Sequence, residues 1–197
     1  MRKSNPWISI SDLLSSVVLV LLLLFIMASI MPKYNQENQR RQMMTQIDQS
    51  LQAYEDQVHV DTKSGILEFS EVTFDSGSAI INPRTREILR QLATELKMYM
   101  DQNKNMGLMI EGHTDPSPVT ISRLVDRGGF FTNNIQLSTL RAANVREELL
   151  KTMGKEYAKR IGAAGYGETR LKNSEQPQSP ENRRIELRIM WNEKSEE

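Results

Sequence analysis

The most strongly apolar part of the chain lies close to the N-terminus. Residues 13–31 contain no charged side chain and consist mostly of leucine, valine, isoleucine and methionine. As an α-helix rising ~1.5 Å per residue, this run would be about 28 Å long, which matches the hydrocarbon thickness of a bilayer. A cleaved signal sequence has a shorter apolar core, of roughly 7–15 residues, followed by a small-residue cleavage site. Because Ala28-Ser29-Ile30 fits such a site poorly, we expect a retained transmembrane helix over residues 7–31.

The next stretch is polar and favours helix. We expect a spacer helix over residues 32–60, within which Met44, Ile47, Leu51 and Tyr54 recur at three- and four-residue spacing. This narrow apolar stripe suits a short coiled coil or docking on another helix. It is equally compatible with the weak apolar edge of a solvated spacer.

The remainder of the chain alternates between strand and helix patterns. Strands are expected where apolar and polar residues alternate or a short apolar run follows a turn, and helices where apolar residues recur every three or four positions. The predicted strands are 66–70, 108–111, 161–166 and 184–191, and the predicted helices begin at Asn82-Pro83 and at Ser138. This order indicates an α+β fold with helices packed on one face of a mixed sheet.

Composition narrows the classes of function. The formal net charge is zero, so no global positive field favours nucleic acid. There is no cysteine, which excludes disulfides, and with His59 and His113 as the two histidines a zinc site of the common kinds is not expected. The sequence also shows no nucleophile–base set, so we expect a protein that is not an enzyme and has no cofactor.

Asp12 is the acidic residue at the edge of the apolar run, and two interpretations apply to it. In the first, Asp12 caps the transmembrane helix among the lipid headgroups. In the second, the helix begins near Pro6, before the interfacial Trp7, and Asp12 lies about 9 Å further along the helix axis. At that depth exposure to lipid would cost ~2.5–3.5 kcal/mol, so the side chain would face a partner or water. Ser15 and Ser16 extend the same polar face by one turn.

Five short motifs follow one another in the region of strands and helices. They are Phe74-Asp75-Ser76-Gly77-Ser78-Ala79, Ile110-Glu111-Gly112-His113-Thr114-Asp115, Asn134-x-x-Leu137-Ser138-x-x-Arg141-Ala142, Gly165-Tyr166-Gly167-Glu168 and Asn182-Arg183-Arg184-Ile185. In this order they resemble the OmpA-like peptidoglycan-binding domain over residues 66–192. The resemblance implies a β-α-β-α-β-β core that clamps the diaminopimelate of the cell-wall peptide. We therefore expect this domain over residues 61–192, followed by a disordered tail at 193–197.

The resemblance also assigns roles to individual residues. The free end of diaminopimelate carries an ammonium and a carboxylate. The resemblance implies that Asp115 binds the ammonium and that Arg141, whose planar guanidinium can bind a carboxylate bidentately, binds the carboxylate. The further candidates for peptidoglycan binding are Thr114, Asn134, Leu137 and Arg183. From the residues alone an alternative stays open, in which Asp115 caps a turn and Arg141 pairs with it inside the protein.

Two neighbouring features modify this expectation. His113 is expected to support the strand end by hydrogen bonding rather than to ligate anything. The segment 116–133 is longer than the compact loop of outer-membrane members. Its Arg123, Asp126, Arg127 and the run Gly128-Gly129-Phe130-Phe131 would cover or reshape the pocket.

A single membrane helix with an early aspartate, a spacer and an OmpA-like domain together resemble the MotB-type stator subunits. This resemblance implies a homodimer in which Asp12 carries H⁺ or Na⁺ beside a multi-span MotA/ZorA-like membrane subunit, while the domain holds peptidoglycan. Lysine and arginine are nearly balanced across the span and do not orient it. Because peptidoglycan lies outside the inner membrane, the resemblance makes the tail at residues 1–6 cytoplasmic and the domain periplasmic.

The kind of motor is suggested by the N-terminal residues. The very short tail, with Asn5-Pro6-Trp7 and the run from Ser11 to Ser15, resembles the ZorB subunits of Zorya anti-phage systems. Flagellar MotB subunits usually carry a longer basic tail and an aromatic-rich span. A flagellar stator subunit and a passive tether between membrane and wall stand as alternatives.

Overall fold

The computed structural model describes residues 6–70, 74, 78–119 and 130–191. The chain divides into two compact units, residues 1–42 and 43–197. Parts of the predicted features lie outside the described residues: the N-terminal tail up to residue 5, the motif residues 75–77, the loop residues 120–129 and the C-terminal tail.

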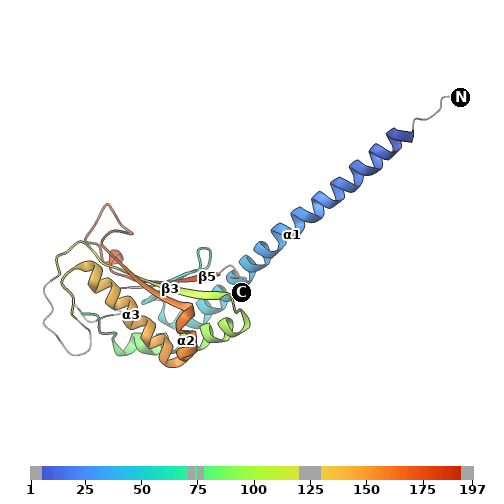
Figure 1. Ribbon diagram of the computed structural model, residues 1–197. Helices are drawn as coiled ribbons and strands as arrows, with labels where there is room; N and C mark the ends of the chain where they lie inside the picture. The colour runs from blue at the N-terminus through green and yellow to red at the C-terminus, as the bar shows by residue number, and fades with distance from the viewer. Residues whose placement is uncertain (1–5, 71–73, 75–77, 120–129, 192–197) are drawn as a thin grey trace. The chain divides into compact units, whose positions relative to one another are not determined.

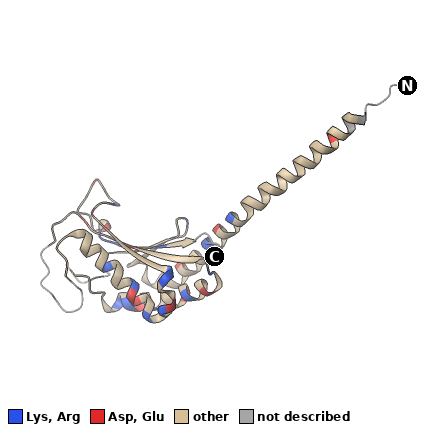
Figure 2. Cartoon of the chain, in the orientation of Figure 1, with Lys and Arg blue, Asp and Glu red and all other residues tan. Residues whose placement is uncertain are grey.

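The first unit consists of most of helix α1, which runs from Pro6 to Leu51 (Figure 1). The predicted membrane helix and spacer therefore form one helix, and Pro32 lies inside it. The long uncharged stretch of α1 is evident in Figure 2. Its apolar side chains are exposed, and its most apolar window has a mean hydropathy of 2.9. Within the described residues, α1 is the one helix long and apolar enough to cross a membrane.

The second unit is built on a five-stranded sheet with the strand order β1-β2-β5-β3-β4. The strands are β1 Val58–Asp61, β2 Ile66–Phe69, β3 Met106–His113, β4 Ile161–Gly167 and β5 Ile185–Trp191. β3 and β4 are parallel and the other neighbouring pairs are antiparallel, so the sheet is mixed. Two helices, α2 Pro83–Gln102 and α3 Asn134–Met153, cover one face of it (Figure 1). This arrangement confirms the predicted α+β class.

Strand β1 replaces the last part of the predicted spacer helix. Helix α1 ends at Leu51, a short 3₁₀ turn follows, and Val58–Asp61 pair with β2. The prediction of helix up to residue 60 was wrong because Val58 and Val60 alternate with polar residues, a two-residue period that suits a strand.

The apolar stripe at the end of α1 belongs to the core of the second unit. Met44, Ile47 and Leu51 are fully or almost fully buried in the main core, and Tyr54 packs against it. The Gln91 side chain of α2 donates a hydrogen bond to the Ser50 carbonyl at 2.8 Å. The stripe therefore docks on the domain, which decides between the two interpretations left open by its spacing.

Both domain helices begin at asparagine caps. The Asn82 side chain accepts from the Thr85 amide, so α2 starts where the sequence predicted. Helix α3 starts four residues before the predicted Ser138, because Asn133 accepts a hydrogen bond from the Gln136 amide at 2.9 Å. The correction matters for the site, since it moves Asn134 from a loop into the first turn of α3.

Candidate functional site

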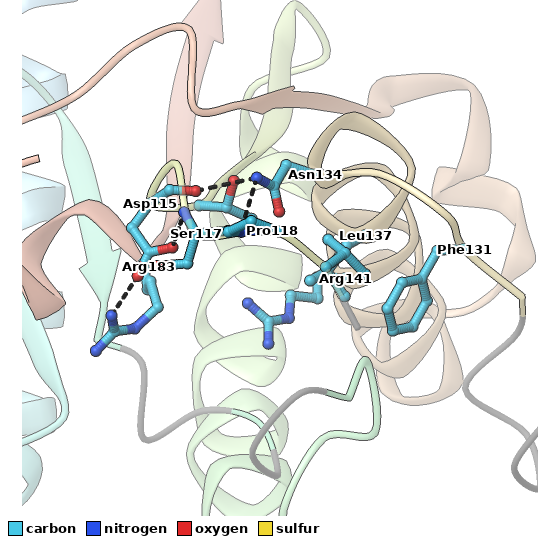
Figure 3. A pocket seen from close by; sticks show the side chains of 10 residues that line it. Asp115, Ser117, Pro118, Phe131, Asn134, Leu137, Arg141 and Arg183 are labelled. Atoms are coloured by element: carbon cyan, nitrogen blue, oxygen red, sulfur yellow. Dashed lines mark hydrogen bonds and ion pairs between the residues drawn. The ribbon is translucent and has the colours of Figure 1, made fainter. Parts of the chain in front are cut away.

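An open pocket of about 330 Å³ lies where β3 ends and α3 begins (Figure 3). It is lined by Thr114, Asp115, Ser117, Pro118, Val119, Phe131, Asn134, Leu137, Arg141 and Arg183. All six residues that the sequence proposed for peptidoglycan binding are in this set. Residues more than 60 positions apart are thereby brought to one site.

Two glycines allow α3 to lie this close to the sheet. A Cβ at Gly112 would lie 2.1 Å from the Ser138 carbonyl oxygen, and one at Gly165 would lie 2.2 Å from the Thr139 amide nitrogen. Contacts under 3.0 Å are essentially never made by real Cβ atoms. The absence of side chains at these positions therefore sets the distance between the ends of β3 and β4 and the first turns of α3.

Asp115 is the acidic group of the pocket, and it is 6% exposed. One of its carboxylate oxygens accepts the Ser117 amide at 2.9 Å, and the other forms an ion pair with Arg183. Burial by itself raises the pKa of Asp115, but the Arg183 guanidinium and the hydrogen bonds from Ser117 outweigh it, so the net pKa is below the usual value. Asp115 is therefore ionised at neutral pH.

Arg141 lies on the opposite side of the pocket and is also 6% exposed. Its Nε donates to the Ser78 carbonyl at 2.9 Å, and its guanidinium lies 4.9 Å from the centre of the Phe74 ring. The alternative interpretation was therefore half correct. Asp115 does cap a turn at Ser117, but its ion-pair partner is Arg183 (Figure 3).

Asn134 and Thr114 shape the loop between these charges. The Asn134 amide donates to the carbonyls of Asp115 and Ser117, at 3.2 and 3.1 Å, so its side chain fixes the backbone of the pocket rim. The Thr114 hydroxyl is buried and has no hydrogen-bond partner within the described part of the chain. It is consequently the group of the pocket best placed to take a new polar partner.

The remaining wall of the pocket is apolar. Phe131 and Leu137 are buried with Ala79 in a small cluster of their own, against which Val119 and Leu140 pack. Phe131 was identified only as part of a long loop, and its burial shows that the end of this loop forms part of the pocket wall. Among the described lining residues, the charged groups are one carboxylate, Asp115, and two guanidiniums, Arg141 and Arg183.

Asp12 lies in the first unit, six residues inside α1. Helix α1 begins at Pro6, so Asp12 does not cap it. The Ser16 hydroxyl donates to the backbone carbonyl of Asp12 at 2.8 Å, and thus not to its carboxylate.

The fold of the domain is similar to that of several solved structures. The cell wall anchor of the T6SS from Pseudomonas aeruginosa matches 76% of this chain and 97% of its own, with a TM-score of 0.56 and 22% identity. The periplasmic domain of Helicobacter pylori MotB matches 66% of this chain and 78% of its own, with a TM-score of 0.53 and 19% identity. A putative MotB-like protein from Desulfovibrio vulgaris matches 82% and 99%, with a TM-score of 0.51 and 22% identity.

The sequence itself also matches a known family. No curated protein matches the chain significantly. Residues 73–184, however, match the OmpA family, and this segment contains all the lining residues of the pocket, from Thr114 to Arg183, together with β3, α3 and β4. Because the match covers more than half of the chain, the protein belongs to the OmpA family.

Proposed function

We propose that this protein is the B-type stator subunit of an ion-driven motor in the bacterial inner membrane. Its domain holds peptidoglycan, and Asp12 of α1 is the ion-carrying carboxylate. The observation that carries the proposal is the presence, in one chain, of an OmpA-family pocket with paired charges and an acidic residue inside a helix long enough to cross a membrane.

The pocket suits the free end of a diaminopimelate side chain. Asp115 is ionised and would receive the ammonium, and Arg141 would receive the carboxylate from the facing wall. The ammonium would take the place of Arg183 on Asp115. Arg183 would then turn to the ligand carboxylate, which it would share with Arg141. A lysine side chain has no carboxylate for Arg141 to bind, which favours diaminopimelate over lysine.

The motor half of the proposal rests on Asp12. A carboxylate at this position in a membrane helix would have to face a partner or water, because exposure to lipid costs ~2.5–3.5 kcal/mol. One helix cannot line an ion path, so a multi-span MotA/ZorA-like subunit would supply the rest and a homodimer of this chain would stand within it. Since the wall lies outside the inner membrane, the N-terminus is cytoplasmic and the domain periplasmic. The ion is H⁺ or Na⁺.

The motor we favour belongs to Zorya-type anti-phage defence, because of the Asn5-Pro6-Trp7 sequence and the run from Ser11 to Ser15. A flagellar MotB-type subunit is the second candidate. A gene for a multi-span partner next to this one supports either motor. Helicase or nuclease genes beside it support defence, whereas flagellar genes support swimming.

The experiment compares Asp12→Asn with Asp48→Asn, both expressed from the native locus. Asp48 lies in the same helix outside the apolar run and is exposed, so its substitution controls for loss of an acidic group from α1. We expect Asp12→Asn to abolish phage protection or swimming while membrane insertion and co-sedimentation with peptidoglycan persist. Asp48→Asn should keep all three.

The competing function is a passive tether, which the fold shared with a T6SS cell wall anchor makes a specific alternative. A tether needs no ionisable group in its membrane helix. Full activity of Asp12→Asn would therefore remove the motor from the proposal and leave the tether.

A further inference from the structure

A group of ionisable residues lies on the sheet face opposite to α2 and α3. Glu111 and His113 point to this face from β3, and Glu186 is the register partner of Glu111 on β5. One potential ligand atom from each residue lies within 4.8 Å of the other two. Glu111 and His113 are buried, and Glu186 is partly buried. The group is separate from the lining of the pocket.

His113 is the unusual member of the group. It is 2% exposed, and neither ring nitrogen has a hydrogen-bond partner within the described part of the chain. Its Nε2 lies 3.9 Å from a Glu186 carboxylate oxygen, and its ring stacks on Tyr166 at 5.5 Å. Burial, followed by the charge of Arg184, lowers the pKa of His113 to about 4, so the ring is neutral at neutral pH. A buried imidazole with a free lone pair next to two carboxylates calls for a partner.

Contrary to the expectation from the sequence, we propose that Glu111, His113 and Glu186 bind one divalent transition-metal ion of the Zn²⁺ class. One imidazole nitrogen and two carboxylate oxygens are a ligand set that zinc accepts, with bonds of roughly 2.0–2.2 Å. In a tetrahedral site such bonds place ligand atoms roughly 3.4 Å apart. The distances between the three ligand atoms are at most 4.8 Å and therefore have to shorten by at most about 1.4 Å, which side-chain rotation supplies.

Two arginines compete with the metal, and they differ in how firmly they are held. Arg184 is buried and contacts one oxygen of Glu186 at 2.8 Å. Arg188 contacts Glu111 and the other oxygen of Glu186 at 3.3 Å each, and its side chain is 39% exposed. Arg188 can leave for solvent without breaking a short ion pair. The metal thus takes the place of Arg188, while Arg184 stays on Glu186. Arg170, which is stacked on Tyr166, adds positive charge nearby and lowers the affinity for the metal ion.

The bound metal would also affect the neighbouring pocket. A metal held by Glu111, His113 and Glu186 would join β3 to β5 close to the ends from which Asp115 and Arg183 extend. The inference itself does not depend on what the pocket binds, because it rests on the three ligands alone.

The test uses the full chain in detergent micelles after treatment with a chelator. Titration calorimetry with Zn²⁺ should show one equivalent bound, and Co²⁺ should give the visible absorption of a low-coordinate N/O site. Loss of a residue that only hydrogen-bonds to a metal ligand usually weakens metal binding about 10–100-fold. His113→Gln removes a ligand itself, so it should weaken binding by at least about 100-fold. The matched control is His59→Gln, since His59 is exposed on β1 and should not matter. Arg188→Gln should strengthen binding.

The opposite results overturn the inference. Three results would do so. The wild-type chain could fail to bind Zn²⁺ stoichiometrically, His113→Gln and His59→Gln could lose the same affinity for Zn²⁺, or Arg188→Gln could bind Zn²⁺ more weakly than wild type. If His113→Gln does not fold by circular dichroism, Glu111→Gln takes its place, and unchanged affinity in that variant also overturns the site.

Discussion

Replacing Gly112 by alanine tests whether close contact between β3 and α3 builds the pocket. The added Cβ would lie 2.1 Å from a backbone oxygen of Ser138, so strand or helix would have to move by about 1 Å to restore the 3.0 Å that real Cβ atoms keep. Overpacking costs ~1–3 kcal/mol, and a backbone neighbour puts this case at the upper end. Replacing glycine in a strand recovers ~0.5–1 kcal/mol. The free energy of unfolding should therefore fall by about 2 kcal/mol.

The matched control is Gly162→Ala in β4. There the nearest atoms are the end of the Met109 side chain, at 2.9 and 3.0 Å, which can turn away. We expect Gly112→Ala to lower the melting temperature by about 4–8 °C and to weaken peptidoglycan binding, and Gly162→Ala to change both little. Melting followed by circular dichroism and co-sedimentation with purified peptidoglycan measure the two effects. Equal melting temperatures for the two variants would refute the argument.

Three further predictions concern the pocket, the loop held by Asn182 and the C-terminal end of α2. Arg141→Lys should weaken binding of diaminopimelate-type peptidoglycan about tenfold, because an ammonium cannot bind a carboxylate bidentately; unchanged co-sedimentation would contradict this. Asn182→Ala should lower the melting temperature and expose residues 172–177 to protease, because the buried Asn182 side chain makes five hydrogen bonds to this loop, from 2.8 to 3.2 Å; resistance equal to wild type would count against it. Hydrogen bonds from Lys97 and Tyr157 lower the pKa of Asp101 in the folded protein. The stability that this carboxylate contributes is therefore present above its ordinary pKa of about 3.9 and is lost as the pH falls through the folded pKa. The melting temperatures of wild type and Asp101→Asn should differ at pH 7 and converge in acid.

The sequence predicts best where short motifs coincide with the ends of elements. Asn82-Pro83 marks the start of α2, and the strand ending in Gly112-His113-Thr114-Asp115 is present as β3. Such features are local, since a cap or an alternating pattern is complete within a few residues. The six candidate residues of the pocket could be named for the same reason, because each lies in one of these motifs.

The parts that could not be predicted depend on contacts distant in sequence. The ion pair between Asp115 and Arg183 joins residues 68 positions apart, and nothing local distinguishes it from a pair with Arg141. The burial of Phe131 likewise depends on how a long loop returns to α3. His113 was expected to form hydrogen bonds, but within the described part of the chain its nitrogens have none.

The last turns of α1 determine how a load would enter the domain. Because Met43, Met44, Ile47 and Leu51 are part of the core, a pull along this helix has to separate four packed side chains from the core at once. A fragment cut at residue 61, the boundary expected from the motifs, would lose this part of its interior and leave apolar surface open to aggregation. A fragment for crystallisation or wall-binding work should therefore begin at or before Met43.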